Sequence, residues 1–242
     1  MSARSEEIAA GLRRDDPEAW AISLYAPAAL RAHVQVLAAF AHELRQISTR
    51  VSQPLAGEMR LQWWRDVLEK PGSGDGVSPL AEALLASVQQ LRLPVAALVA
   101  MIDAHAHDLY GEAFADEAAL ESYCGASDAA LLRLTTLVLA QGGDPGGAGI
   151  CGHAGMAAGI LRVAGRFGPA MLENIEAPLQ LAQVHLRAAE AGIATLDPAA
   201  RPALVGLGLV KARLRKWQRG RGVEISPLAR LAQLWLYARR LP

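Results

Sequence analysis

The chain has 242 residues, of which 52% are hydrophobic, 20% are charged and 5% are aromatic. This balance excludes a disordered chain, and abundant alanine and leucine with few aromatics favour packed helices over sheets. Twenty-four basic residues balance 24 acidic ones, so no net charge draws the chain toward nucleic acid. We therefore expect no nucleic-acid partner.

The predicted helices follow one another along nearly the whole chain, because apolar residues recur with helical spacing. Asp16 and Pro17 are typical of the N-cap and first turn of a short helix that runs to Leu24. Glycine-rich loops are predicted at 71–78 and 142–149. The other predicted helices span 25–51, 55–70, 79–92, 94–111, 117–124, 128–141, 150–168, 178–191, 202–219 and 227–240. We predict one all-α domain over residues 1–242.

The first residues, the longest apolar stretch and the two cysteines indicate where in the cell the protein is located. MSARSEEIAAGLRRDD mixes charges of both signs and lacks the apolar region of a signal peptide. The longest strongly apolar stretch, 93–102, is about half of the roughly 20 residues that a membrane-spanning helix needs. Cys124 and Cys151 lack the spacing of a metal or disulfide framework and suit buried thiols. We expect a cytoplasmic protein, with attachment to the surface of the inner membrane as an open alternative.

A polar stripe lies along the predicted helix 25–51. Its members share one helix face because they are spaced i, i+3, i+4 and i+7. They are His42, Arg45, Gln46 and Thr49. The pattern leaves open whether this face does chemistry or marks a place where chemistry was lost.

The sequence HAHD at 105–108 suggests a metal site only at first sight. His105 and His107 are two residues apart, so on a helix they point in different directions. Spacing favours two ordinary hydrogen-bonded pairs on a helix surface, His105 with Asp108 and His107 with Asp103. We expect no metal ligation here.

A basic segment lies at 211–222 and contains no acidic residue. It consists of Lys211, Arg213, Arg215, Lys216, Arg219 and Arg221, with Trp217 among them. One interpretation is a solvated helix end. The other is contact with an acidic partner or an anionic membrane, where each basic residue contributes about 1 kcal/mol and Trp217 lies among the headgroups.

Two stretches near the start resemble the opening of the squalene/phytoene synthase family. LYAPAALRAHVQVLAAFAHELRQI is similar to the family's proline-led helix that ends in an aspartate-rich motif. MRLQWWRDVLE is similar to the next helix, which carries an arginine, an apolar residue and a tryptophan pair. The matching residues are Arg60, Leu61, Trp63, Trp64 and Arg65.

Two later stretches extend the resemblance over most of the chain. HDLYGEAFADEAALESYC is similar to a mid-chain segment with a Tyr-Cys pair, here Tyr123 and Cys124. GHAGMAAGILRVAG is similar to the helix with the second aspartate-rich motif, and the spacing of its Gly152, Gly155 and Gly159 predicts close helix packing. The resemblance implies a single-domain, isoprenoid-synthase-like helical bundle around a central cavity. In the family, Mg²⁺ bound by the two motifs holds prenyl diphosphates there.

The aspartates of both motifs are missing from this chain. Arg45, Gln46 and Thr49 stand where the first motif offers carboxylates. The degenerate second motif consists of Gly159, Arg162, Val163 and Phe167. Arginine cannot ligate Mg²⁺, and valine and phenylalanine offer no lone pair, so the comparison implies no catalytic residue, no metal and no cofactor. Residual anion binding by Arg45 stays open, since a guanidinium suits phosphate oxygens.

The chain also resembles a branch of the family that lacks the aspartates and acts in assembling mitochondrial respiratory complex I. GMAAGILRV and ISPLARLAQLWLYARR are similar to that branch. The resemblance implies a bacterial, non-catalytic binding protein that helps to assemble a membrane respiratory complex. One alternative is a prenyl transferase with an atypical Mg²⁺ site at Asp103, Asp108 or Asp116. Another is a carrier that binds an isoprenoid or lipid.

Overall fold

The computed structural model describes residues 3–70, 78–166 and 176–242. These residues form helices and contain no strand, which confirms the all-α prediction. The α-helices are α1 (Ala3–Asp15), α2 (Pro17–Ser23), α3 (Ala28–Arg50), α4 (Pro54–Glu69), α5 (Pro79–Leu91), α6 (Val95–Ala104), α7 (Glu117–Cys124), α8 (Ala130–Leu139), α9 (Ala148–Arg166), α10 (Glu176–Gly192), α11 (Leu207–Gln218) and α12 (Pro227–Ala238). Short turns are η1 (His107–Leu109), the π-helical η2 (Gly125–Ala129), η4 (Ile193–Thr195) and η5 (Arg201–Gly206).

Helix starts follow local capping chemistry. Asp16, Ser78, Asp116 and Ser226 each accept a hydrogen bond from the backbone amide three residues on. Three of the four are followed directly by proline, whose missing amide costs nothing in a first helical turn. The predicted helix starts at residues 17, 79 and 227 are therefore confirmed.

Some expected boundaries are wrong. Residues 3–15, for which no helix was expected, form α1, which buries Ile8 and Leu12. The expected helix 94–111 ends at Ala104, and the expected helix 202–219 begins as the 3₁₀ turn η5. The expected helix 128–141 starts only at Ala130, after η2. Residues 3–15 are helical because α1 packs against α2, α3 and α5, which outweighs the weak local signal.

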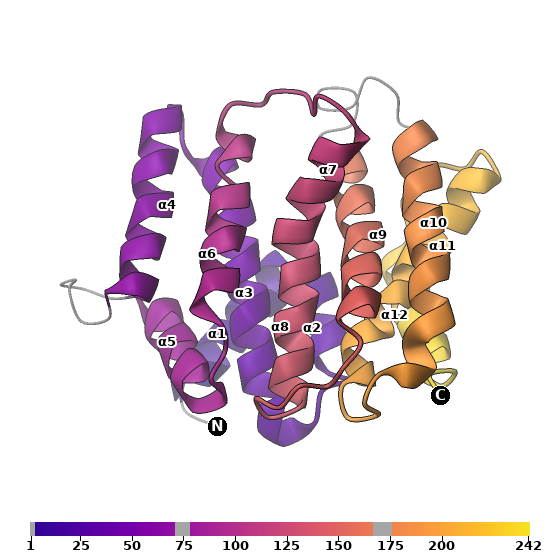
Figure 1. Cartoon of the computed structure of the whole chain (residues 1–242), viewed down its shortest axis with the longest axis horizontal. Helices are drawn as coiled ribbons and strands as arrows, with labels where there is room; N and C mark the ends of the chain where they lie inside the picture. The colour runs from indigo at the N-terminus through magenta and orange to yellow at the C-terminus, as the bar shows by residue number, and fades with distance from the viewer. Residues whose placement is uncertain (1–2, 71–77, 167–175) are drawn as a thin grey trace.

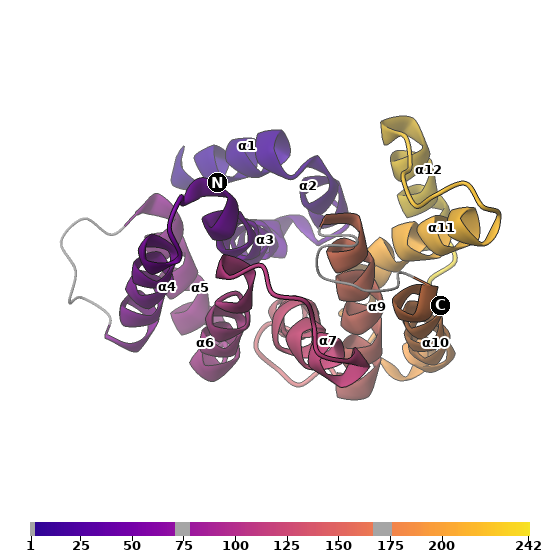
Figure 2. The same cartoon turned by 90° about the horizontal axis from the view of Figure 1, so that it is seen from above.

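The long helix α3 lies in the middle of the molecule. It packs against α1, α2, α4, α5 and α8. Helices α4 to α6 lie at one end, and α9 to α12 at the other (Figures 1 and 2). None of the described helices is long and apolar enough to cross a lipid bilayer.

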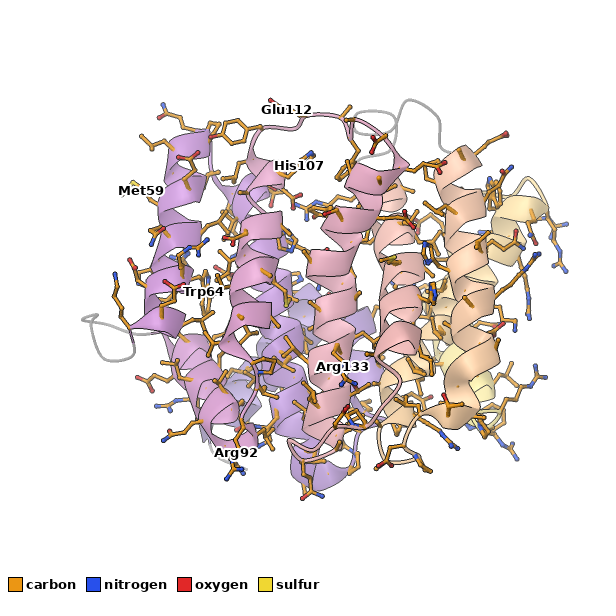
Figure 3. All side chains as sticks on the ribbon, viewed as in Figure 1. Met59, Trp64, Arg92, His107, Glu112 and Arg133 are labelled. Carbon is orange, nitrogen blue, oxygen red and sulfur yellow. The ribbon has the colours of Figure 1, made fainter. Side chains whose placement is uncertain are left out.

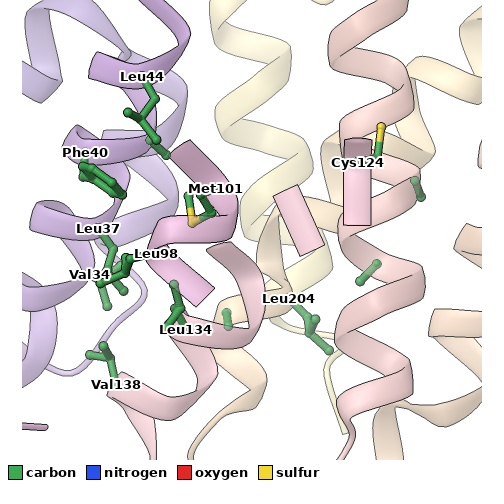
Figure 4. Packing of buried hydrophobic residues seen from close by; sticks show 14 of the residues in the cluster. Val34, Leu37, Phe40, Leu44, Leu98, Met101, Cys124, Leu134, Val138 and Leu204 are labelled. Carbon is green, nitrogen blue, oxygen red and sulfur yellow. The ribbon is translucent and has the colours of Figure 1, made fainter. Parts of the chain in front are cut away.

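One continuous apolar core runs from Ile8 to Leu214. Phe40 of α3 is fully buried and meets Trp64 of α4 edge to face, with ring centroids 4.9 Å apart. Leu37 and Leu44 of α3 lie in the same core, which α6 and α8 complete (Figure 4). Figure 3 shows Trp64 turned inward from α4, whereas Met59 on the same helix points away. The prediction of a single domain over residues 1–242 stays a prediction, since three segments lie outside the description.

Two glycines of α9 let η2 approach closely. A Cβ at Gly155 would lie 2.2 Å from the Cα of Ala129, and one at Gly159 would lie 2.9 Å from the Sγ of Cys124. Both distances are far below contact distance, so only glycine fits. A Cβ at Gly152, on the same face of α9 but one turn earlier, would meet nothing within 4 Å. The expectation of close packing is confirmed for Gly155 and Gly159 and is wrong for Gly152, because none of the described neighbouring helices comes close to it.

This geometry predicts opposite effects for one substitution at two sites of α9. Gly155→Ala forces the backbone of η2 to shift, and we expect a loss of about 1–3 kcal/mol in the free energy of unfolding. Gly152→Ala gains helix propensity without a clash, and we expect a gain of roughly 0.5–1 kcal/mol. Urea unfolding followed by circular dichroism measures both. Equal effects at the two sites would contradict the close approach of α9 and η2.

Candidate functional site

A cavity of about 650 Å³ lies between α3, α8, α9 and α11. All four residues of the polar stripe line it, and Arg162 of the degenerate second motif faces them from α9. The stripe residues are His42, Arg45, Gln46 and Thr49. The structure thus brings residues of the two degenerate motifs to one cavity. Val163 and Gly159 are buried in the helix packing instead, and Phe167 lies outside the described residues.

The first-motif side of the cavity is an internally paired polar surface. Asp16 lies 3.6 Å from the Nδ1 of His42 and 3.6 Å from the Nη2 of Arg45. Burial alone would raise the pKa of Asp16, but the polar contact with His42 and the charge of Arg45 lower it to about 2. The hydroxyl of Thr49 donates to the backbone and side-chain oxygens of Gln46, at 2.9 and 3.0 Å. Asp16 is therefore already paired with the Arg45 cation and lies beside the ring of His42.

The second-motif side is organised by the ion pair between Arg162 and Asp128. The Nε of Arg162 donates to Oδ1 at 3.0 Å, and Nη2 donates to Oδ2 at 2.6 Å. Ser127 donates a further hydrogen bond to Oδ2 at 3.0 Å. Burial opposes the charge of Asp128, but the Arg162 cation outweighs it and lowers the pKa of this carboxyl group. Sequence reasoning missed Asp128, since only the fold places it opposite Arg162.

A buried hydrogen-bond chain continues from this pair into the core. Arg162 donates to the hydroxyl of Tyr123 at 3.4 Å, and Tyr123 donates to Oδ1 of Asp108 at 2.9 Å. The other oxygen of Asp108 lies 2.9 Å from the Nδ1 of His105. Burial lowers the pKa of His105 and raises that of Cys124, so the neighbouring thiol is held protonated. Tyr123 thus connects the mid-chain segment to the cavity wall.

The HAHD interpretation needs correction. His105 and Asp108 do pair, but the pair is buried and does not lie on a helix surface. The expected pair of His107 with Asp103 is wrong, because α6 ends at Ala104 and helical spacing is lost. His107 instead stacks on Phe114, with centroids 4.5 Å apart.

The three carboxylates of the enzyme alternative lie in separate places. Asp103 pairs with Arg65 on the surface, Asp108 is buried in the hydrogen-bond chain, and Asp116 caps α7. Within the described residues, no group of three or more histidines, cysteines or acidic residues is placed to hold a metal ion. Mg²⁺ requires several convergent oxygen ligands, which these positions do not supply.

The residues of the family pattern on α4 support the fold and lie away from the cavity. Trp64 is buried against Phe40, and Trp63 packs against Trp64. The guanidinium of Arg60 lies over the ring of Trp63 and donates to Glu43 at 3.0 Å.

The basic segment 211–221 divides into two groups. Three cations form hydrogen bonds within the protein. Lys211 donates to Glu190 at 2.6 Å, and the two terminal nitrogens of Arg213 donate to the two carboxylate oxygens of Glu18. Lys216 donates to the backbone oxygen of Glu224. Trp217 packs partly against the core. The other three cations are exposed: Arg215, Arg219 and Arg221.

The buried pair predicts a large effect at Arg162. Arg162→Met leaves Asp128 buried without its cation, and we expect a loss of about 3–5 kcal/mol in the free energy of unfolding. Arg65→Met removes the partner of the half-exposed Asp103, and we expect a loss below about 1 kcal/mol. Urea unfolding at neutral pH gives both values. Recovery of stability on adding Asp128→Asn to Arg162→Met identifies the unpaired charge as the cause, and similar small losses for both single variants would disprove it.

Comparisons with known proteins agree with this architecture. The chain is 33% identical to complex I assembly factor 6 of Bos taurus and 32% identical to that of Homo sapiens, over 129 residues. The match covers 53% of this chain but only 39% of each relative. The fold matches the crystal structure of a dehydrosqualene synthase with a TM-score of 0.72 and 14% identity, over 98% of this chain and 96% of that one.

The family assignment rests on a match that is longer than the 129 residues shared with these relatives. The sequence model described as squalene/phytoene synthase matches residues 12–172, which include the cavity-lining helices α3 and α9. That match exceeds half of the chain, and the structural match confirms the isoprenoid-synthase-like helical bundle. The chain belongs to the squalene/phytoene synthase family.

Proposed function

We propose that this chain is a non-catalytic family member that acts by binding, in the assembly of a membrane respiratory complex of the complex I type. The observation that carries the proposal is the pairing within the cavity. Asp16 is engaged by His42 and Arg45, and Asp128 is engaged by Arg162. The matched relatives are complex I assembly factors, which supports the choice of process.

The described part of the cavity is not equipped to neutralise the diphosphate that leaves in the reaction of the family's enzymes. Departure of a diphosphate requires its negative charge to be neutralised, which Mg²⁺ does only when convergent carboxylates hold it. The described walls of the cavity instead present arginines to the carboxylates. The metal-dependent condensation is therefore not supported, and we propose neither a metal nor a cofactor for this chain.

A deletion strain tests the assembly role. We expect loss of the gene to lower NADH:quinone oxidoreductase activity and the amount of assembled complex on native gels, while succinate dehydrogenase stays unchanged. Expression of the wild-type chain restores both measures. Normal assembly and activity in the deletion strain would refute the assembly role.

A second candidate, a carrier of an isoprenoid or lipid with an anionic headgroup, is favoured by the walls of the cavity. Arg45 of α3 and Arg162 and Arg166 of α9 all line the cavity, and Arg166 also donates to the Ser48 hydroxyl at 3.1 Å. Apolar side chains continue from them: Leu131, Leu132, Leu161, Leu207 and Val210. Guanidinium groups bind phosphate oxygens without a metal, and apolar walls suit a hydrocarbon tail.

Calorimetric titration with a non-hydrolysable farnesyl diphosphate analogue tests this candidate. For a carrier we expect binding that EDTA leaves unchanged and that Arg45→Gln weakens about tenfold, or by about 1.4 kcal/mol. Arg60→Gln, outside the cavity, serves as the control and leaves binding unchanged. Binding that requires Mg²⁺, with turnover of farnesyl diphosphate, would favour the prenyl transferase alternative. Absence of binding would leave the scaffold role alone.

A further inference from the structure

Helix α12 carries its large apolar side chains on the outside of the molecule. Leu228, Leu231, Trp235 and Leu236 are exposed to 82%, 54%, 51% and 40%. They account for four of the nine large apolar side chains that are well exposed in the described part of the chain. Leu234 is the buried residue of the helix. An apolar face of this kind indicates an interaction surface.

The geometry of the helix directs this stripe outward. Leu228, Leu231 and Trp235 follow i, i+3 and i+7, so they share one face. At 100° per residue, the centre of that face lies about 90° around the helix from the buried Leu234 and roughly opposite Tyr237. Helix α12 packs on α11, where a Cβ at Gly208 would lie 2.6 Å from the Cβ of Tyr237. Figure 2 shows α12 at the margin of the molecule, at the end remote from α4.

Exposed cations flank the apolar stripe. Residues 211–242 contain nine basic residues and a single acidic one, Glu224, which is exposed. Lys211, Arg213, Lys216 and Arg230 are held by protein oxygens. The other five are exposed at the end of α11, in the following loop and at the end of α12: Arg215, Arg219, Arg221, Arg239 and Arg240.

One of the exposed cations, Arg239, also contacts the apolar stripe directly. The guanidinium of Arg239 lies 4.6 Å from the centre of the Trp235 ring. A tryptophan under an arginine presents both an apolar ring and a positive charge at one place, which suits the boundary between headgroups and acyl chains.

We propose that α12 and the exposed arginines around it form a docking surface for an anionic lipid bilayer. The helix lies in the plane of the membrane, with Leu228, Leu231 and Trp235 inserted below the headgroups. The arginines contact lipid phosphates around it. This surface lies outside the cavity, and the proposal does not depend on the assembly role.

The positive charge around α12 favours an anionic bilayer over a second copy of the chain as the partner of this surface. A symmetric dimer through this face would bring two sets of exposed arginines together with only Glu224 from each copy to offset them. An anionic membrane offers the complementary charge over an extended plane. Of the basic segment, the proposal keeps the exposed Arg215, Arg219 and Arg221. It leaves out Lys211, Arg213 and Lys216, which are engaged within the protein.

Co-sedimentation with vesicles tests the surface. One vesicle type is phosphatidylcholine alone, and the other is phosphatidylcholine mixed with phosphatidylglycerol. We expect the wild-type chain to bind the anionic vesicles at least about tenfold more tightly, with binding that weakens as salt rises. The variant Leu228→Ser, Leu231→Ser, Trp235→Ser and the variant Arg219→Gln, Arg221→Gln each lose about tenfold or more in vesicle binding.

The chain supplies a matched control on α4. Leu55 and Met59 are exposed to 64% and 67%, and we expect Leu55→Ser, Met59→Ser to leave vesicle binding unchanged. Circular dichroism melts confirm that every variant is folded. Equal binding to both vesicle types, or an equal loss in the α4 control, overturns the proposal. So does a wild-type dimer that only the α12 variant dissociates, because the occupant is then a second copy.

Discussion

The buried ion pair between Arg162 and Asp128 is the interaction on which this structure depends. It joins α9 to the π-helical turn η2 at the place where Gly155 and Gly159 allow the two backbones to meet. A buried ion pair is stabilised by further hydrogen bonds, of which Ser127 supplies one to Asp128 and Tyr123 accepts one from Arg162, while the Nη1 of Arg162 has no hydrogen-bond partner among the described residues. The guanidinium of Arg162 also forms part of the cavity wall. The same residue therefore determines both the packing of α9 on η2 and the charge of the cavity.

This coupling supports the proposal that the cavity serves binding and not metal chemistry. Asp16 caps α2 and also faces His42 and Arg45, so one carboxylate serves both the fold and the charge balance. Asp128 is likewise committed to Arg162. Carboxylates that hold arginines are not free to hold Mg²⁺, and their lowered pKa values reflect that commitment. The interior cavity and the outer face of α12 are then two independent surfaces for binding.

Much of the fold follows from local sequence. Serine or aspartate before proline marks helix starts, because a side-chain oxygen satisfies a free amide and proline has none to lose. Helical spacing puts His42, Arg45, Gln46 and Thr49 on one face, and all four line the cavity. Residues 3–15 were missed, since α1 is stabilised by burying Ile8 and Leu12 against distant helices.

The sequence by itself determined the helical class, most helix starts, the shared face of the polar stripe and the absence of carboxylates at positions 45, 46, 49 and 163. These properties depend on residue identity and on contacts within a few residues of chain. Only the tertiary structure decided that Asp128 meets Arg162, that His105 and Asp108 are buried, and which cations stay exposed near α12. Those outcomes depend on which helix faces meet, and that is set by packing between segments far apart in the chain.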